Sequence, residues 1–151
     1  MNINVEIQIL DSAKGLSLPC YQTSGSVGMD LFSVEDLFLF PSGADGSIEI
    51  VSTGICLRIP VGFEGQIRPR SSLACRFGVT VINSPGTIDS DYTGEIKVGL
   101  INHSRNRFKI SRGDRIAQIV FAPVAYASLV EVDDLEKTER GNNGFGSTGK
   151  N

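Results

Sequence analysis

The sequence predicts an all-β fold, a jelly-roll-like β-sandwich or barrel. Short runs rich in β-branched and aromatic residues recur along most of the chain, and glycine and proline separate them. No long window shows the apolar face of an extended helix. Many short strands at close spacing favour two sheets that pack together, because this arrangement protects the sheet edges.

The expected elements follow from local patterns along the chain. Residues 3–9 alternate between apolar and polar side chains, which is the period of a half-buried strand. Residues 71–77 suit a single helical turn. Residues 86–95 have glycine near both ends and acidic residues between them, which predicts a β-hairpin. Further strands are expected at residues 48–59, 77–82, 95–101, 115–124 and 124–132.

The chain is expected to form one domain followed by a tail. With 151 residues, a single domain buries roughly 70% of the surface that its unfolded chain exposes. The strand-like pattern fades after Val132, and glycine recurs at positions 141, 144, 146 and 149. We therefore predict a β domain at residues 1–133 and a flexible, glycine-rich C-terminal arm at residues 134–151.

Composition and charge argue against several classes of function. A net charge of −3 provides no basic field for nucleic acid, and no apolar stretch is long enough to cross a membrane. Residues 1–10 lack the order of regions that marks a signal peptide. Cys20, Cys56 and Cys75 are odd in number and widely spaced, so neither a disulfide framework nor a zinc site is indicated. These features favour a cytoplasmic protein with reduced thiols.

Two polar segments have the residue types that bind phosphate or activate water. The segment PRSSLA (69–74) combines Arg70 with two serines at the start of the expected helical turn, where unpaired N–H groups favour an anion. The alternative is a serine helix cap beside a surface arginine. The segment GTIDSDYTGE (86–95) places Asp89, Asp91 and Glu95 around Tyr92, and it can hold one of these carboxylates toward a water and the aromatic ring against a sugar. Its alternative is an acidic, solvated turn.

Two later segments are also candidates for ligand contact. Gln118 interrupts the apolar run at residues 115–124, although a lone glutamine in a strand is more often a satisfied amide than a ligand. The segment RGNNGFGSTG (140–149) combines Arg140, a glycine-rich backbone and Phe145, which suits a lid over phosphate and a base. Disorder is the alternative for this composition, but a purely solvating tail gains nothing from an isolated phenylalanine.

Five strings in this order resemble the motifs of the homotrimeric dUTPase family. They are VGMDLFS (27–33), PRSSLA (69–74), GTIDSDYTGE (86–95) with the preceding Asn83, GDRIAQIVF (113–121) and RGNNGFGSTG (140–149). Together they span residues 27–149. Each string is short, but five in the right order with compatible spacing make chance agreement improbable.

The resemblance implies a jelly-roll enzyme that hydrolyses dUTP to dUMP and pyrophosphate, which supplies dUMP and keeps uracil out of DNA. It also implies a homotrimer whose subunits share their active sites. Asp89 would activate the water for in-line attack on the α-phosphorus. A Mg²⁺ ion would be held by the substrate phosphates and water rather than by the protein, and Asp30 would support the metal-bound waters.

The resemblance also assigns contacts to the triphosphate. Arg70, Ser71 and Gln118 would act with Asp89 in catalysis by holding the phosphate chain. Arg140, in the lid motif, would bind the γ-phosphate. The remaining implied substrate contacts are Ser72, Thr87, Ile88, Lys97, Gly146 and Ser147.

The base and the sugar would be recognised by three side chains. Phe145 would stack over the uracil, and Asn83 would hydrogen-bond its edge. Tyr92 would pack against the deoxyribose, so that a ribose 2′-hydroxyl does not fit. These contacts would separate dUTP from UTP.

Departures from the family pattern keep a rival function open. The second motif often reads Arg-Ser-Gly where this chain has Arg70, Ser71 and Ser72, and the serine at position 72 brings it closer to the related dCTP deaminases. Those enzymes place a catalytic glutamate in the strand after the third motif, where this chain has Gly99. A catalytically silent binding module is a second rival, and the retained Asp89 argues against it. A basic cluster at residues 105–115 is interpreted as a solvated or subunit-facing surface.

Overall fold

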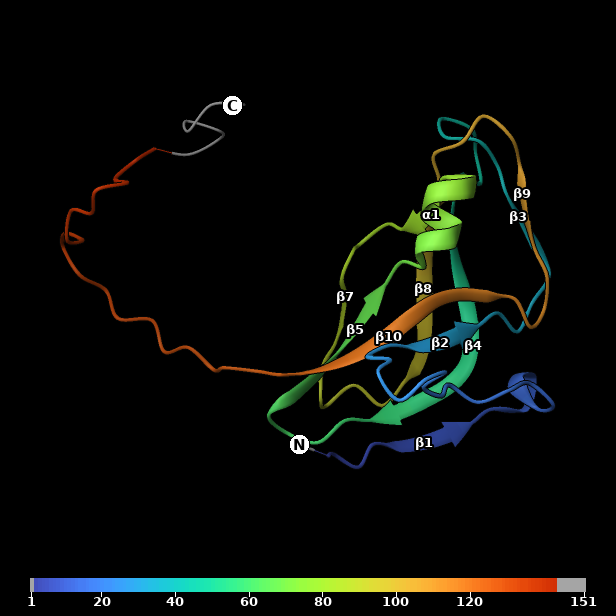
Figure 1. Cartoon of the computed structure of the whole chain (residues 1–151), viewed down its shortest axis with the longest axis horizontal. Coiled ribbons are helices and arrows are strands. Elements are labelled where there is room, and N and C mark those ends of the chain that lie inside the picture. Colours follow the sequence, from blue (N-terminus) through green and yellow to red (C-terminus); the bar gives the residue numbers. More distant parts are fainter. Residues whose placement is uncertain (1, 144–151) are drawn as a thin grey trace.

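Antiparallel β-sheets form the body of the molecule (Figure 1). The computed structural model describes residues 2–143. The first sheet has the strand order β1 (Glu6–Ile9), β4 (Ile48–Arg58), β8 (Glu95–Asn102) and β6 (Val79–Val81). The second sheet has the order β2 (Met29–Phe32), β10 (Arg115–Pro123), β5 (Phe63–Arg68) and β7 (Gly86–Ile88). A smaller ribbon pairs β3 (Leu37–Leu39) with β9 (Phe108–Ile110).

The helices are short. A 3₁₀ turn spans Asp11–Ala13, and α1 spans Ser71–Phe77, as the sequence predicts. The α-helix ends because Gly78 adopts a left-handed conformation, with φ of 69°, that other residues rarely enter. Within the described part of the chain, no helix has the length and apolar character needed to cross a membrane.

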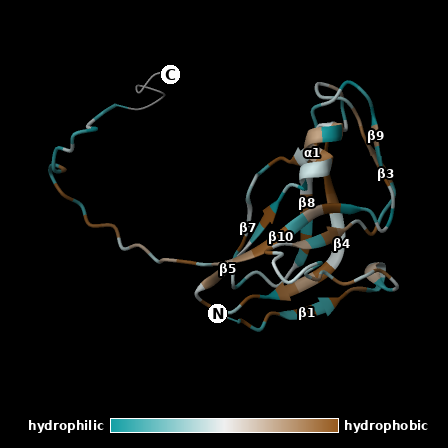
Figure 2. Cartoon of the chain, viewed as in Figure 1, coloured by the Kyte–Doolittle hydropathy of each residue, from teal (hydrophilic) through white to brown (hydrophobic). Residues whose placement is uncertain are grey.

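One apolar core holds the two sheets together. On β8, Ile96, Val98 and Leu100 are buried, whereas Lys97 between them is exposed, which is the alternation of a strand with one face inward. Leu31 from β2 and Ile119 from β10 belong to the same buried cluster. Figure 2 shows hydrophobic stretches along the central strands. Burial of each such side chain stabilises the fold by about 1.5–3 kcal/mol. The packed antiparallel sheets confirm the all-β prediction.

The strand expected at residues 124–132 is wrong. β10 ends at Pro123, and the chain then leads away from the body (Figure 1). Tyr126 is 73% exposed and Leu129 is 96% exposed. Alternating polarity produces a strand only where a neighbouring strand supplies hydrogen-bond partners, and within residues 2–143 this segment pairs with none. The other expected strands are confirmed, although β1 and β6 are shorter than predicted.

The β-hairpin expected at residues 86–95 is also wrong. β7 pairs with β5 in the second sheet, whereas β8 pairs with β4 and β6 in the first. Residues 89–94 therefore cross from one sheet to the other. Glycine and acidic residues indicate a tight connection, but they do not determine which strand each flanking segment will pair with.

Candidate active site

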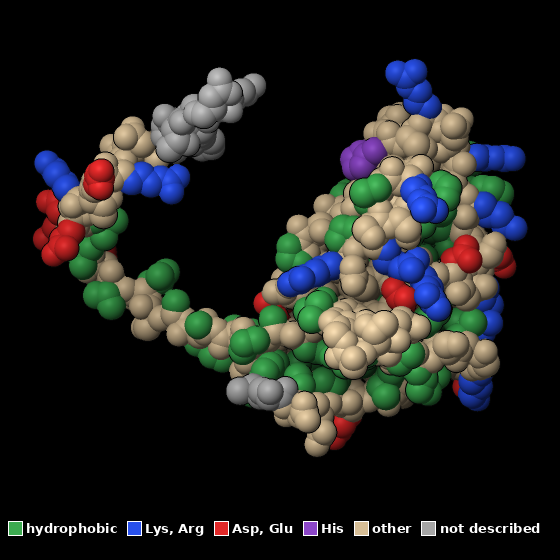
Figure 3. Space-filling model, viewed as in Figure 1, with side chains coloured by type: hydrophobic (Ala, Val, Ile, Leu, Met, Phe, Trp, Pro, Cys, Tyr) green, Lys and Arg blue, Asp and Glu red, His purple; other side chains and the backbone are tan. Residues whose placement is uncertain are grey.

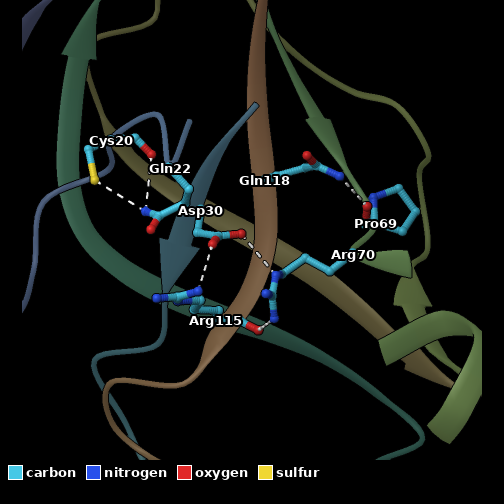
Figure 4. Close-up of polar contacts among 7 residues, drawn as sticks. All are labelled: Cys20, Gln22, Asp30, Pro69, Arg70, Arg115 and Gln118. Atoms are coloured by element: carbon cyan, nitrogen blue, oxygen red, sulfur yellow. Dashed lines mark hydrogen bonds and ion pairs between the residues drawn. The ribbon is translucent and has the colours of Figure 1, made fainter. Parts of the chain in front are cut away.

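Asp30 on β2 lies between two arginine side chains (Figure 4). Its Oδ1 accepts a hydrogen bond from Nε of Arg70 at 2.9 Å, and its Oδ2 lies 3.4 Å from Nη1 of Arg115. Nη1 of Arg70 also donates to the carbonyl oxygen of Arg115 at 3.2 Å. The side chains of Asp30 and Arg70 are only 15% and 24% exposed, so solvent screens this pair less than a surface ion pair. The cluster combines one carboxylate with two guanidinium groups and so carries a net positive charge.

Strand register brings the glutamine of the fourth motif to the same place. Gln118 on β10 pairs with Asp30 on one side and with Arg68 of β5 on the other. Residues in register across a sheet project from the same face, so the amide lies beside the ion-pair cluster. Its Nε2 donates to the carbonyl oxygen of Pro69 at 2.8 Å (Figure 4). A Cβ at residue 28 would overlap the amide oxygen of Gln118. The absence of a side chain at Gly28 therefore provides the space that the Gln118 amide occupies.

The two serines of the second motif stand at the start of α1. Arg70 occupies the N-cap position without a side-chain cap hydrogen bond, so the alternative of a serine cap is wrong. Ser71 and Ser72 are both exposed. A cavity of about 390 Å³ lies next to the start of this helix, and its lining includes Arg70, Leu73, Asp114 and Arg115. Two guanidinium groups at the wall of a cavity of this size suit an anionic ligand.

A second group of candidate residues lies in the crossing loop at residues 89–94. Asp89 is exposed and directly follows β7. A turn joins it to Tyr92, whose backbone N–H donates to the Asp89 carbonyl oxygen at 3.2 Å. The hydroxyl of Tyr92 donates to the carbonyl oxygen of Glu95 at 2.9 Å. An accessible carboxylate beside an anchored aromatic ring has the parts of a general base next to a sugar-binding surface.

Asn83 lies next to two glycines. A Cβ at Gly86 would stand 3.1 Å from Nδ2 of Asn83, and a Cβ at Gly99 would stand 3.7 Å from its Oδ1. A side chain at residue 99 would therefore reach the amide that the resemblance assigns to the base. The glutamate that deamination requires is replaced there by glycine. Of the other expected contacts, Thr87 and Ile88 lie on β7, and Lys97 lies on β8 with its Nζ 3.7 Å from Oε2 of Glu95.

Within one chain these two groups lie apart. β5 separates β10 from β7, and Gln118 pairs with Arg68 whereas Ile88 pairs with Gly65. Asp89 is thus level with Glu64, four residues along β5 from Arg68. Four residues along a strand correspond to roughly 13 Å, and the two strand spacings from β10 to β7 add roughly 10 Å across the sheet. These distances separate the backbone of Asp89 from that of Gln118. Asp89 cannot act on a phosphate held by Arg70 of the same chain without a large rearrangement.

The lid motif falls largely outside the described residues. Arg140 makes a local turn, in which its Nε donates to the carbonyl oxygen of Asn143 at 3.0 Å. It is exposed and lies in the segment that leads away from the body. Phe145, Gly146 and Ser147 are beyond residue 143, so the structure does not test the roles expected of them.

The described residues contain no protein-built metal centre. Among residues 2–143, no three or more histidine, cysteine, aspartate or glutamate side chains cluster as metal ligands would. Of the carboxylates in this part of the chain, Asp30 is the one that pairs with both arginines of the cluster, one through each oxygen. A carboxylate has about four lone-pair sites, so each oxygen can still accept a hydrogen bond from a water.

Arg115 belongs to the candidate cluster through its contact with Asp30, although the sequence did not indicate it. The sequence places it in a basic cluster, and Figure 3 shows Lys and Arg side chains spread over the surface around α1 and β9. Its contact with Asp30 comes from the pairing of β10 with β2, where Arg115 is in register with Phe32. The available signal is its position in the string GDRIAQIVF, three residues before Gln118.

Comparisons with known proteins agree with this arrangement. The dUTPase family model matches residues 14–149. The deoxyuridine 5′-triphosphate nucleotidohydrolase of Nautilia profundicola is 54% identical over 133 residues, which cover 88% of this chain and 91% of that protein. The enzyme of the same name from Neorickettsia sennetsu is 50% identical and covers 99% of both chains. A dUTPase variant of Staphylococcus bacteriophage 80alpha, solved with dUpNHpp, has the same fold, with a TM-score of 0.85, 24% identity and coverage of 98% of this chain and 99% of that one.

Proposed function

The chain belongs to the dUTPase family and is a nucleotide hydrolase that acts on dUTP, and we propose that it forms dUMP and pyrophosphate at a site shared between subunits. The observation that carries this proposal is the Asp30, Arg70, Arg115 and Gln118 cluster beside a cavity of about 390 Å³. This cluster offers cationic and amide donors to a triphosphate. The same chain also carries an exposed carboxylate at Asp89, in the second group of candidate residues.

Asp89 acts as the general base. Its carboxylate takes a proton from water as the water oxygen attacks the α-phosphorus, and the bond from that phosphorus to the bridging oxygen breaks. Pyrophosphate then leaves with the bonding electrons. Proton transfer of this kind contributes about 10²- to 10⁴-fold in rate, so charge stabilisation supplies most of the remaining acceleration.

The phosphate chain is held by groups that the fold orients before substrate arrives. Asp30 fixes Arg70 through Nε, which leaves other guanidinium N–H donors for phosphate oxygens. Arg115 adds a second positive charge, and Ser71 and Ser72 add exposed hydroxyls. Gln118 contributes its amide. Because these donors are positioned in the free protein, little reorganisation is required during the reaction.

Mg²⁺ would bind through the substrate phosphates and water, where it neutralises charge on the triphosphate. Asp30 is the described carboxylate best placed to accept hydrogen bonds from the waters around that ion. It would do so without giving up its arginine partners, because each oxygen has a second lone pair.

Asn83 recognises the uracil edge, and Tyr92 closes the space beside C2′ of the sugar. The partial exposure of Tyr92 supports this role, since the residue is 44% exposed while its hydroxyl is anchored. A ribose 2′-hydroxyl would meet the ring and lose its hydrogen bonds to water, which disfavours UTP. Thr87, Ile88 and Lys97 complete the substrate contacts from the flanking strands.

The working form is a homotrimer. The separation of Asp89 from Arg70 within one chain supports this proposal, because a neighbouring chain can supply one of them to a shared site. Exposed apolar side chains after β10, including Tyr126, Leu129 and Val130, support further contact with a neighbour. Residues 1–133 form the catalytic domain. Residues 134–151 form an arm whose Arg140, Phe145, Gly146 and Ser147 close over the nucleotide.

The cellular role follows from the reaction. Hydrolysis of dUTP supplies dUMP and removes a precursor that would place uracil in DNA. We assign the enzyme to the cytoplasm, since Cys20, Cys56 and Cys75 are free thiols that a reducing compartment maintains.

A substrate comparison tests this function. The enzyme is offered dUTP, dCTP and UTP, each with Mg²⁺, and pyrophosphate and ammonia are followed separately. We expect pyrophosphate from dUTP, little from UTP and no ammonia from dCTP. Ammonia release from dCTP would instead identify a deaminase, and the absence of product from every nucleotide would identify a binding module.

A further inference from the structure

We propose that Gly94 determines sugar specificity by positioning the Tyr92 ring. This inference rests on the proposed role of Tyr92 beside the deoxyribose. Gly94 acts as a positioning residue rather than as a substrate contact, since the Tyr92 ring lies over it. The residue type at position 94 would then set where the ring lies and how much space remains next to C2′.

The ring occupies the volume that a side chain at residue 94 would need. A Cβ at Gly94 would stand 2.7 Å from the hydroxyl oxygen of Tyr92, 2.8 Å from Cζ and 3.1 Å from Cε2. Contacts shorter than about 3 Å between such atoms are strongly repulsive, since favourable carbon contacts lie near 3.5–4.0 Å. Any other residue at this position would displace the ring.

The hydroxyl end of the ring has a fixed anchor. The Tyr92 hydroxyl donates to the carbonyl oxygen of Glu95 at 2.9 Å. Glu95 begins β8, pairs with Cys56 of β4, and uses Oε1 to accept the backbone N–H of Gly54 at 2.9 Å. The acceptor therefore belongs to a paired strand of the sheet rather than to the crossing loop at residues 89–94. A displaced ring would have to break this hydrogen bond.

Tyr92 also remains partly exposed. Tyr92 is 44% exposed, and its backbone N–H is bound to the carbonyl oxygen of Asp89. The turn that carries the general base thus also carries the ring. Moving the ring away from residue 94 changes the distance between its exposed face and the sugar while Asp89 keeps its own backbone position. Specificity is expected to change more than the rate of the chemical step.

The test is the Gly94→Ala variant, with kcat and KM measured for dUTP and UTP. We expect the ratio of kcat/KM for dUTP to that for UTP to fall by about tenfold or more, within the range that single pocket contacts contribute. KM should account for most of the change. Gly25→Ala is the matched control, because a Cβ at that exposed loop glycine meets nothing within 4 Å, and it should keep the wild-type ratio.

The same substitution in a Tyr92→Ala background separates positioning from a general structural effect. If Gly94 acts through the ring, adding Gly94→Ala to Tyr92→Ala leaves the dUTP to UTP ratio unchanged. A Gly94→Ala enzyme that discriminates as well as wild type, or a further loss of discrimination in the double variant, would overturn the inference. A wild-type enzyme that does not prefer dUTP would instead overturn the proposed function.

Discussion

Replacing Asp89 by asparagine is expected to lower the turnover of dUTP by roughly 10²- to 10⁴-fold, the usual contribution of a general base. Asparagine has nearly the same shape but cannot accept the proton of the attacking water. Because Asp89 is exposed and lies after the end of β7, the fold should not change. The measurements are kcat for dUTP, its dissociation constant by calorimetry, and the melting temperature.

Asp91→Asn is the matched control for this variant. Asp91 is exposed in the same loop, two residues away, so the substitution removes the same charge from nearly the same place. Its turnover should stay within a few-fold of wild type. Near-normal turnover of Asp89→Asn, or an equal loss in both variants, would contradict the role of Asp89 as base.

Removal of residues 140–151 is expected to reduce dUTP hydrolysis by at least about 100-fold, as the loss of a preorganised charge-stabilising donor does elsewhere. The truncation removes Arg140 and Phe145, which we assign to the γ-phosphate and to uracil. The melting temperature should change little, because Arg140 bonds only to its own turn among the described residues. Activity and thermal unfolding of the truncated and full chains provide the test.

A shorter truncation controls for loss of the chain end itself. An enzyme that lacks only residues 150 and 151 keeps the whole lid motif and should remain active. If the longer truncation proved as fast as the full chain, the arm would have no part in catalysis. A marked fall in its melting temperature would instead assign residues 140–151 to stability.

Local patterns predicted most of the strands but not all of their partners. The alternation on β8 indicates which side chains are buried, because it reflects the two faces of a single strand. It does not identify the neighbouring strand. The local pattern therefore predicts a hairpin at residues 86–95, although the flanks belong to different sheets. The pattern likewise predicts a strand at residues 124–132, where no partner strand is present among the described residues.

The site is predicted in part for the same reason. Motif resemblance points to Arg70, Gln118 and Asp89 because their types and spacing are visible in the sequence. The ion pairs of Asp30 with Arg70 and Arg115 join segments that lie 40 or more residues apart, so only the fold brings them together. The same applies to the separation of Asp89 from Arg70 along β5, which is the strongest structural argument for a shared site.

Mixing two inactive variants tests the shared site most directly. Asp89→Asn and Arg70→Ala chains are unfolded and refolded together, and each is also refolded alone. If one chain supplies Asp89 and its neighbour supplies Arg70, each mixed trimer contains one intact site, so about one quarter of all sites recover in a random equimolar mixture of symmetric trimers. We predict that dUTP hydrolysis returns in the mixture only. A mixture as inactive as the separate variants, with mixed trimers present by native mass spectrometry, would contradict the account.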